Sequence, residues 1–445
     1  MILLLQSHTW FDAYRYFTLK RYAAEWGVRL INVVEAGTPN YRDLDDTSAI
    51  RRIEVGILST DVILAELEKQ RVRLADIRWV VSPSENLTKI AGKISERLGL
   101  VGPSAESAEL GIDKAALREF CRKKALGGLR SWSADPGQRS PSEREMWESD
   151  LRQNASGELI VKPRRGRGGF QKQPWHYQVF QNAGQLLDSE IWPQMLAIGE
   201  WHIEEYRSSA VRPAWDVHVD FGTTDYEIFL IAQTWCSAHD PRIVISEGPV
   251  EMPDELLECV ENHVREIWRL GYRRHLGNLQ FVETGYAESS GSGSTRALPT
   301  SAAHDVRRDF GFGPLHLMDF NTRMAGVLAF LEEGMCPDLD RRAFEMYVLG
   351  KRRRALNWRF THYRKGPFPV LAGRKLKSAH WPKFDDERRE QFLVKYEENL
   401  RIGERTPPVI HSLQPKPQVA ALGHGIDEVR SRLDEFWRDC LFEYE

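Results

Sequence analysis

Short apolar runs alternate with amphipathic stretches over the first hundred residues. The runs typical of buried β-strands are Ile2–Leu5, Arg29–Val34, Val55–Leu58 and Ile77–Val81. Helical spacing of apolar positions lies between them, including Ala13–Trp26, Asp61–Gln70 and Glu85–Leu98. This alternation predicts a parallel sheet with helices on both faces. No GxGxxG follows the first run, so the pattern does not indicate a dinucleotide site.

After residue 105 the pattern predicts helices and strands, some of which carry polar residues at regular spacing. Helices are predicted over Asp113–Lys124, Glu255–Leu270 and Ile426–Phe442. Strands are predicted over Leu159–Val161, Trp201–Glu205, Trp215–Phe221, Ile228–Trp235, Leu279–Val282 and Leu315–Phe320. Between the last two strands, the small polar residues 289–294 are typical of a flexible loop. The whole chain is therefore expected to be of the α/β (α+β) class.

Composition places the chain among ordinary globular proteins. Its 445 residues suggest two or three domains, and 42% of them are hydrophobic. The net charge of −3 favours neither nucleic acid nor an acidic membrane as a partner. No apolar run approaches the roughly 20 residues of a membrane span, and the apolar start lacks the basic flank of a signal peptide. The five cysteines are widely spaced, which is typical of free thiols in a reducing compartment. We therefore expect a cytoplasmic protein.

Oxygen-bearing side chains recur at every second position near residue 320. Asp319, Asn321 and Arg323 should lie on one strand face, with Met318 and Phe320 facing a core. Gln280 stands between Leu279 and Phe281 on another predicted strand. Carboxylate and amide oxygens suit Mg²⁺, and an arginine suits phosphate. These strands therefore predict a Mg²⁺–phosphate site.

These two segments resemble the metal strands of the ATP-grasp superfamily, of the carboxylate–amine ligase type with carbamoyl-phosphate-synthetase-like strands. The resemblance implies metal roles for Gln280, Asp319 and Asn321. It implies that Arg323 is catalytic and holds the transferred phosphoryl group and the acyl phosphate. Asp319 departs from the family pattern, where glutamate is more usual.

Other motifs follow in the order of that family. Residues 101–104 and then Asp113-Lys114 resemble the entry into the central domain, and Leu159–Pro163 resembles the strand with a second phosphate lysine. The resemblance implies ATP phosphate contacts for Lys114 and Lys162, and a phosphate-covering loop that includes Gly168 and Gly169. The arginines of this loop are either further phosphate contacts or a solvated turn.

The segment Trp201–Arg207 resembles the hinge that seats adenine. The resemblance implies nucleotide-binding roles for Glu204, Glu205, Tyr206 and Arg207, with one acid on the adenine amine or the ribose. Asp216, on the strand that follows, matches an ATP-binding glutamate and is one methylene shorter. His218 shares a face with Asp216, and we interpret it as a hydrogen-bonded sheet residue and not as a catalyst.

The resemblance covers about half of the chain and implies an ATP-grasp fold with four parts. These are an N-terminal Rossmann-like pre-ATP-grasp domain (1–104), a central lid subdomain (105–200), a catalytic subdomain (201–334) and a C-terminal extension packed on the core (335–445). The extension matches no family motif. Its aromatic residues and the amphipathic Ile426–Phe442 segment are too apolar to remain in water.

The implied activity is an ADP-forming ligation. ATP would phosphorylate a carboxylate, and an amine would displace phosphate, with amino-acid or small-peptide substrates as the first choice. ATP and Mg²⁺ are the expected cofactors, with Mn²⁺ as an alternative metal, and a homodimer is left open. An ATP-grasp phosphotransferase without ligation is the alternative. A nucleic-acid-binding or scaffold protein that uses Lys351–Arg354 is a remote one, since a charge run is usually a solvated face.

Overall fold

The structure is a computed structural model of the chain. It describes residues 1–6, 19–37, 50–82, 84–134, 140–155, 157–165, 178–193, 201–206, 214–236, 244–284, 315–322, 335–368, 374–382, 391–395, 402–404 and 418–445. The predicted loop at 289–294 lies outside these residues, as do Gly168, Gly169, Arg207 and Arg323.

The N-terminal part is a parallel sheet with the strand order β3-β2-β1-β4. Its strands are β1 (Ile2–Gln6), β2 (Leu30–Glu35), β3 (Ile50–Val55) and β4 (Trp79–Val81). Its helical elements are α2 (Thr60–Lys69), the 3₁₀ turn η1 (Leu74–Asp76) and α3 (Glu85–Arg97), and residues 19–25 are also helical. Leu3 and Leu5 pack in one core while Ile2 and Leu4 pack in another, so both sheet faces are buried. This arrangement confirms the predicted α/β class.

The third strand lies earlier than the apolar pattern predicted. The predicted run Val55–Leu58 contains only the last residue of β3, and the Ser59 side chain then accepts a hydrogen bond from the Val62 N–H at the start of α2. β3 is at the edge of the sheet, where polar positions are tolerated. Arg52 and Glu54 therefore alternate with buried Ile53, and the strand has no continuous apolar run.

The middle of the chain forms a small antiparallel sheet, here called the lid sheet, with the order β5-β8-β6-β7. Its strands are β5 (Ser131–Ala134), β6 (Leu159–Pro163), β7 (Gln178–Phe180) and β8 (Trp201–Glu205). The helices of this part are α4 (Ala105–Glu109), α5 (Lys114–Lys123), α6 (Pro141–Asn154) and α7 (Ala183–Leu187). Trp201 and Ile203 face the core beneath α6 and α7, so His202 and Glu204 point to the other side.

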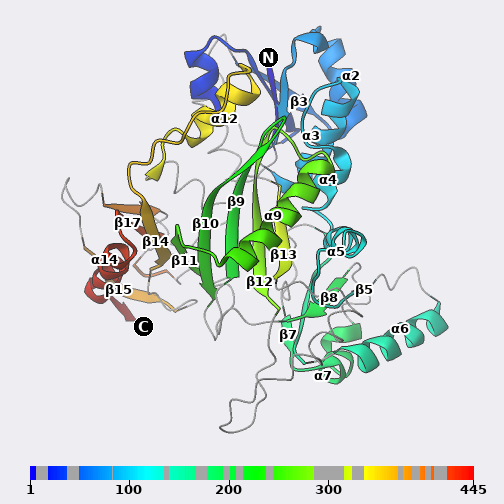
Figure 1. Cartoon of the computed structure of the whole chain (residues 1–445), viewed down its shortest axis with the longest axis vertical. Helices are drawn as coiled ribbons and strands as arrows, with labels where there is room; N and C mark the ends of the chain where they lie inside the picture. The colour runs from blue at the N-terminus through cyan, green and yellow to red at the C-terminus, as the bar shows by residue number, and fades with distance from the viewer. Residues whose placement is uncertain are drawn as a thin grey trace.

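The largest sheet, here called the central sheet, has the order β13-β12-β9-β10-β11-β14-β17-β16 (Figure 1). Its first strands are β9 (Ala214–Phe221), β10 (Tyr226–Cys236), β11 (Val244–Gly248), β12 (His275–Glu283) and β13 (Leu315–Asn321). Helix α9 (Asp254–Arg269) covers one face, where Val217, Leu279 and Phe320 are buried. The other face carries the polar residues of β9 and β12.

The C-terminal part continues this sheet. β14 (His362–Pro367) pairs with β11, and β17 (Gln418–Gly423) and β16 (Phe392–Lys395) follow. Helix α14 (Ile426–Asp439) packs its Val429, Leu433 and Phe436 on these strands, beside the pair of β15 (Leu376–His380) and β18 (Leu441–Tyr444). The apolar face of α14 is therefore buried within the same molecule.

The basic run Lys351–Arg354 contacts acids of its own chain. Arg353 lies 3.1 Å from an Asp225 carboxylate oxygen, and Arg354 lies 3.2 Å from oxygens of Asp338 and Glu345. Arg353 and Arg354 are therefore paired with acids of the same chain.

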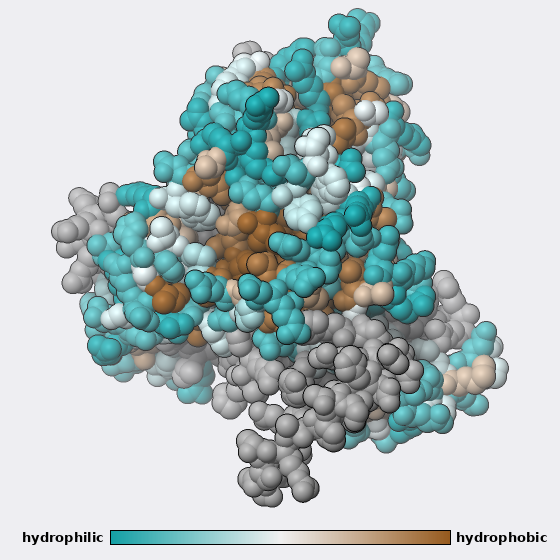
Figure 2. Space-filling view, viewed as in Figure 1, coloured by the Kyte–Doolittle hydropathy of each residue, from teal (hydrophilic) through white to brown (hydrophobic). Residues whose placement is uncertain are grey.

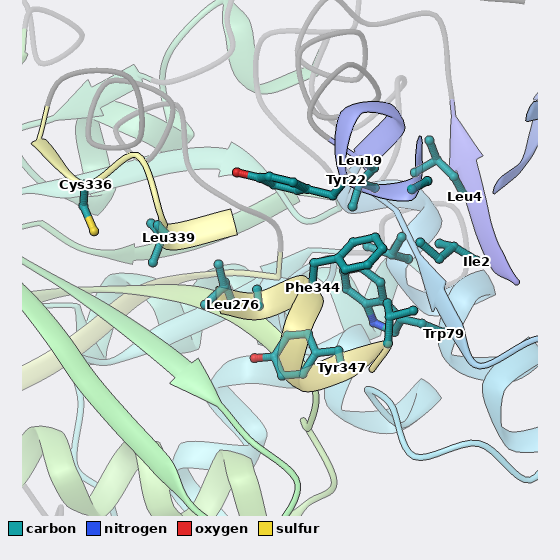
Figure 3. Close-up of a cluster of buried hydrophobic side chains, with 14 of the residues drawn as sticks. Ile2, Leu4, Leu19, Tyr22, Trp79, Leu276, Cys336, Leu339, Phe344 and Tyr347 are labelled. Atoms are coloured by element: carbon teal, nitrogen blue, oxygen red, sulfur yellow. The ribbon is translucent and has the colours of Figure 1, made fainter. Parts of the chain in front are cut away.

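One apolar cluster joins the N-terminal sheet, the central sheet and α12 (Leu339–Tyr347). Figure 3 shows Phe344 between Tyr22 and Trp79, with Tyr347 and Leu276 nearby. The Phe344 ring centroid is 6.0 Å from that of Tyr22 and 5.1 Å from that of Trp26. Residues from three parts of the chain therefore share one core.

Hydrophilic residues cover most of the described surface in Figure 2, and apolar residues gather near the centre of the view, where Figure 1 places the central sheet. None of the helices in the described ranges has both the length and the apolar character that a membrane crossing requires.

We expect Phe344→Ala to lower the free energy of unfolding by about 3–5 kcal/mol, because it opens a cavity in the shared core. Chemical denaturation monitored by tryptophan fluorescence measures this loss. Met146→Ala is the control, since Met146 is 65% exposed and its loss should change stability by less than about 0.5 kcal/mol. Equal losses in the two variants would contradict the role of this core.

Candidate active site

A buried carboxylate joins the lid sheet to the central sheet. Glu204 on β8 is 2% exposed, and its Oε1 contacts Nζ of Lys162 on β6. Its Oε2 accepts a hydrogen bond from Nε of Arg118 on α5 at 2.8 Å. Nε2 of His202 and Nε2 of His316 lie 3.5 and 3.4 Å from the same oxygen. Two cations therefore neutralise one carboxylate where burial would otherwise be costly.

Arg118 also holds the strand that carries the predicted metal ligands. Its Nη2 donates to the Met318 carbonyl at 2.7 Å, and its Nη1 donates to the Leu317 carbonyl. The β12–β13 register shifts here, because Gln280 is opposite Asp319 while Phe281 is opposite Leu317. Met318 is thus the extra residue of a β-bulge, whose freed carbonyl needs a donor.

This bulge corrects part of the predicted alternation. Phe320 lies in the core beneath α9, as expected, but Met318 packs separately near Leu129, Ala214 and Val282. Leu317 instead shares the core with Phe320. The bulge rotates the strand between Leu317 and Asp319, and bulges of this kind re-aim side chains near functional sites.

The groups around Glu204 differ in charge. The backbone N–H of Leu129 donates to Nδ1 of His316 at 2.9 Å, so the ring proton is on Nε2, toward Glu204. Burial, together with Arg118 and Lys162, lowers the pKa of both His202 and His316 well below the ordinary value. Both rings are therefore neutral near pH 7, and the cations here are the arginine and the lysines.

Lys162 and Lys114 approach each other from different elements. Lys114 is the first residue of α5, and its N–H donates to the Arg164 carbonyl at 3.0 Å, just after β6. Burial lowers the pKa of Lys162 well below its ordinary value, Arg118 and Lys114 add to this, and Asp319 opposes it. The effects of Lys114 and Asp319 place both groups within electrostatic reach of Lys162. An anion between them would relieve the repulsion of the cations.

Asp113 fixes the start of the glycine-rich segment. Its carboxylate caps α5 and also accepts hydrogen bonds from Nε of Arg164 at 3.0 Å and Nε of Arg165 at 3.1 Å. These two arginines are therefore paired with protein acid. Gly168 and Gly169 follow outside the described residues, so their predicted phosphate contacts stay predictions.

Asp216, Gln280 and Asp319 form a row across three adjacent strands. Gln280 on β12 is directly opposite Asp216 on β9 and Asp319 on β13. Gln280 Nε2 donates to Asp216 Oδ1 at 2.9 Å, and the Thr234 hydroxyl donates to Asp216 Oδ2. Asp216 therefore fixes the orientation of the Gln280 amide, with its Nε2 toward β9.

A second row lies beside the first on the same face. Asn278 is opposite His218 and Asn321. Asn321 Nδ2 donates to Asn278 Oδ1 at 3.1 Å, and Asn278 Nδ2 lies 3.4 Å from Asp216 Oδ1. The amide N–H groups of Asn321 and Asn278 thus point toward β12 and β9, respectively.

The donor set fits a magnesium ion that arrives with phosphate. Among the described residues, Gln280 Oε1, Asn321 Oδ1 and the Asp319 carboxylate accept no hydrogen bond, which leaves hard oxygens for a metal. No group of three or more His, Cys, Asp or Glu side chains suited to a metal occurs in the described part of the chain. Protein charge alone would hold a divalent ion weakly, and a triphosphate would supply the rest.

The predicted adenine hinge is only partly described. Glu205 donates its N–H to the Arg130 carbonyl at 3.0 Å, and Tyr206 donates its N–H to the Glu158 carbonyl at 2.8 Å. Arg207 and the catalytic candidate Arg323 lie outside the described residues. The side chain of Glu204 is thus paired with Lys162 and Arg118, which distinguishes it from the second hinge acid, Glu205.

Arg118 and Asn278 were not selected from the sequence, and neither were His202, His316 and Thr234. Arg118 is four residues after Lys114, which places both on one side of α5. Asn278 is two residues before Gln280, on the same strand face. Spacing could have identified both, but the acids and carbonyls that they contact are distant in sequence.

The fold matches solved structures over almost its whole length. No protein-family model and no curated protein matches the chain. The L-amino acid ligase from Bacillus licheniformis has a TM-score of 0.68 and 11% identity, over 100% of this chain and 98% of that one. N5-carboxyaminoimidazole synthetase from Staphylococcus aureus, complexed with ADP, has a TM-score of 0.62 and 10% identity, over 98% and 96%.

A third similar structure contains a magnesium nucleotide. The biotin carboxylase domain of the Hydrogenobacter thermophilus 2-oxoglutarate carboxylase, in complex with MgADP, ADP and bicarbonate, has a TM-score of 0.60 and 12% identity. The match covers 100% of this chain and 90% of that one. At these identities the likeness establishes the shared fold.

We expect Arg118→Met to lower the free energy of unfolding by about 3–5 kcal/mol, since it removes one partner of a buried ion pair and unpairs two carbonyls. Urea denaturation measures this loss. The matched control is Arg122→Met on the same helix, where the side chain is 73% exposed and pairs with Glu119. That change should cost less than about 1 kcal/mol. A loss from Arg118→Met no larger than the control's would refute the bridging role.

Proposed function

We propose that this chain, which has the ATP-grasp fold, is an ATP-dependent ligase that activates a carboxylate as an acyl phosphate and joins it to an amine. One observation carries the proposal. The row of Asp216, Gln280 and Asp319 on the central sheet adjoins Lys162 on the lid sheet, because Arg118 contacts both Glu204, the partner of Lys162, and the Met318 carbonyl next to Asp319. Metal-binding oxygens on one side and buried cations on the other are what a magnesium triphosphate requires.

The proposed reaction has two displacements. A carboxylate oxygen of the first substrate attacks the γ-phosphorus of ATP, the bond to the β-phosphate oxygen breaks, and ADP leaves. The amine nitrogen of the second substrate then attacks the acyl carbon, and inorganic phosphate leaves with the bonding electrons. The nitrogen loses a proton, and an amide forms. For each ATP consumed, one amide, one ADP and one inorganic phosphate are therefore formed.

The protein's contribution is mainly electrostatic. Lys114 and Lys162 would bind phosphate oxygens of ATP, and Arg323 would hold the transferred group. Such fixed charges stabilise the charge that spreads over the phosphoryl oxygens in the transition state. Arg118 acts through Glu204 and β13, so it positions these groups and does not itself bind the nucleotide.

Magnesium would be held by Gln280, Asp319 and Asn321 together with the phosphates. Its chemistry there is to neutralise phosphate charge and to polarise the phosphoryl group. Each of these side chains has an oxygen that accepts no hydrogen bond from the described residues, and this supports the assignment.

The nucleotide base and the four-part organisation belong to the same proposal. Glu204, Glu205, Tyr206 and Arg207 would line the adenine and ribose end, and Gly168 and Gly169 would cover the phosphates. The divisions 1–104, 105–200, 201–334 and 335–445 would then be the pre-ATP-grasp domain, lid, catalytic subdomain and extension. The ADP in one similar structure and the L-amino acid ligase activity named for another support ATP and amino-acid substrates.

A phosphate-release screen tests the reaction directly. A panel of carboxylates is crossed with a panel of amines in the presence of Mg²⁺ and ATP, and mass spectrometry identifies the products. If the enzyme is a ligase, phosphate release requires both the carboxylate and the amine, and an amide is detected as the product. A phosphorylated product that forms without an amine would instead identify a phosphotransferase.

Lys162→Ala should weaken MgATP binding by roughly tenfold to a hundredfold, because a charge-assisted hydrogen bond contributes about 1.5–3 kcal/mol. Isothermal titration calorimetry measures this, and circular dichroism checks that the variant is folded. Lys123→Ala is the matched control, because Lys123 is a lysine of α5 whose side chain is 67% exposed. Equal affinity in Lys162→Ala and the parent would show that the lysine does not contact the nucleotide.

Asp319→Asn should reduce turnover about 10²–10³-fold while MgATP affinity changes little, because the lost charge matters most as the phosphoryl group moves. Steady-state phosphate release and calorimetry measure the two effects. Asp427→Asn, at a side chain that is 95% exposed, is the control. Near-normal turnover, or tight Mg²⁺ binding without nucleotide, would remove the basis of the metal site.

A further inference from the structure

A histidine in the second polar row has no hydrogen-bond partner. His218 on β9 is fully buried, and neither Nδ1 nor Nε2 is hydrogen-bonded among the described residues. The sequence led us to expect a satisfied sheet residue there. The great majority of buried polar groups in proteins are hydrogen-bonded, so an imidazole with neither nitrogen paired needs an explanation.

The polar residues next to His218 form hydrogen bonds with residues other than His218. Asn321 donates to Asn278, and Asn278 Nδ2 approaches Asp216, whose other oxygen accepts from Thr234. On the opposite side, His218 is level with Leu230, and the Phe229 ring centroid is 6.1 Å away. The imidazole therefore lies at the border between the polar rows and the apolar core, with neither nitrogen hydrogen-bonded among the described residues.

The local charge favours a ligand that donates a hydrogen bond. Burial lowers the pKa of His218 to about 4, while the Asp216 carboxylate acts in the opposite direction. The ring is thus neutral near pH 7 and offers one acceptor nitrogen and one N–H. The nearby Asp216 charge attracts the positive end of an N–H bond, and it disfavours a second carboxylate.

The position also suits the second substrate. His218 and Asn321 belong to the row that lies beyond Asp216, Gln280 and Asp319, away from the bulge at Met318. The next carbonyl on β13, that of Thr322, lies 3.4 Å from the hydroxyl of Thr88 on α3. His218 therefore lies on the side of the Asp216, Gln280 and Asp319 row that faces the N-terminal sheet, and not on the side of Lys162.

We propose that His218 accepts a hydrogen bond from the amine of the second substrate and so orients that nitrogen toward the acyl carbon. This inference rests on the proposed ligase function. The ring orients the amine without keeping its proton, because it is a weak base in this environment. His218 is thus a substrate-binding residue of the amine site.

A matched histidine is available on the opposite face of the central sheet. His263 on α9 is also fully buried and neutral, with a pKa lowered to about 4 by burial. Its Nδ1 lies 2.8 Å from the Cys259 carbonyl, so one ring nitrogen is satisfied within its own helix. His263→Leu therefore controls for the loss of a buried imidazole.

The experiment uses two probe sets that separate the amine from the carboxylate. Amino-acid amides carry an amine without a free carboxylate, and N-acetyl amino acids carry a carboxylate without an amine. Each pool is added to the full-length protein with Mg²⁺ and a non-hydrolysable ATP analogue, and the melting temperature is measured. A ligand that binds the native state raises it.

We expect both pools to raise the melting temperature of the parent protein and of His263→Leu. His218→Leu should lose the response to the amides and keep the responses to the N-acetyl pool and the nucleotide. Its own melting temperature should not fall, since an unpaired buried polar group is replaced by an apolar one. His218→Gln keeps an acceptor oxygen and should retain part of the amide response.

The amine assignment is overturned if the parent does not respond to the amides, or if His218→Leu responds as the parent does. It is also overturned if His218→Leu and His218→Gln both lose the amide and N-acetyl responses together. Binding is measured here and turnover is measured in the phosphate-release screen, so failure of the ligase function is distinguishable from failure of this assignment.

Discussion

The arrangement of the candidate site depends on the neutralisation of one buried carboxylate. Glu204 is almost inaccessible to water, and an isolated charge there would cost several kcal/mol. Arg118 and Lys162 remove that cost, and each comes from a different element. Because Arg118 also holds the carbonyls of Leu317 and Met318, this ion pair fixes the lid sheet against β13. Loss of the pair would disturb the environment of Lys162 on β6 and the bulge next to Asp319 on β13 together.

Strand register is the second constraint. Side chains that are opposite each other in antiparallel strands share a face, so Asp216, Gln280 and Asp319 are brought together by pairing alone. A slip of one residue would send Asp319 to the apolar face beneath α9. The bulge at Met318 lets the core residues Leu317 and Phe320 and the polar Asp319 each face the correct side, and Arg118 stabilises that irregularity.

The face opposite α9 has two environments, and their border explains the unusual histidine. Toward β10 it is apolar and is covered by the core around Phe344, which ties the N-terminal sheet to the central sheet. Toward β13 it is polar and carries the side-chain oxygens of Gln280, Asp319 and Asn321. His218 lies where these environments meet. A neutral, unpaired imidazole at that border costs stability, and the proposed contact with the substrate amine would offset that cost.

The sequence by itself determined the α/β class and the N-terminal parallel sheet, because alternation and turn residues act over short distances. It also identified Asp319 and Asn321 as neighbours on one strand. Only the tertiary structure decided that Glu204 pairs with Arg118, which is 86 positions away. It also decided the bulge and the addition of the C-terminal strands to the central sheet. Such contacts depend on register and long-range packing, and periodicity along one chain does not encode which distant strands meet.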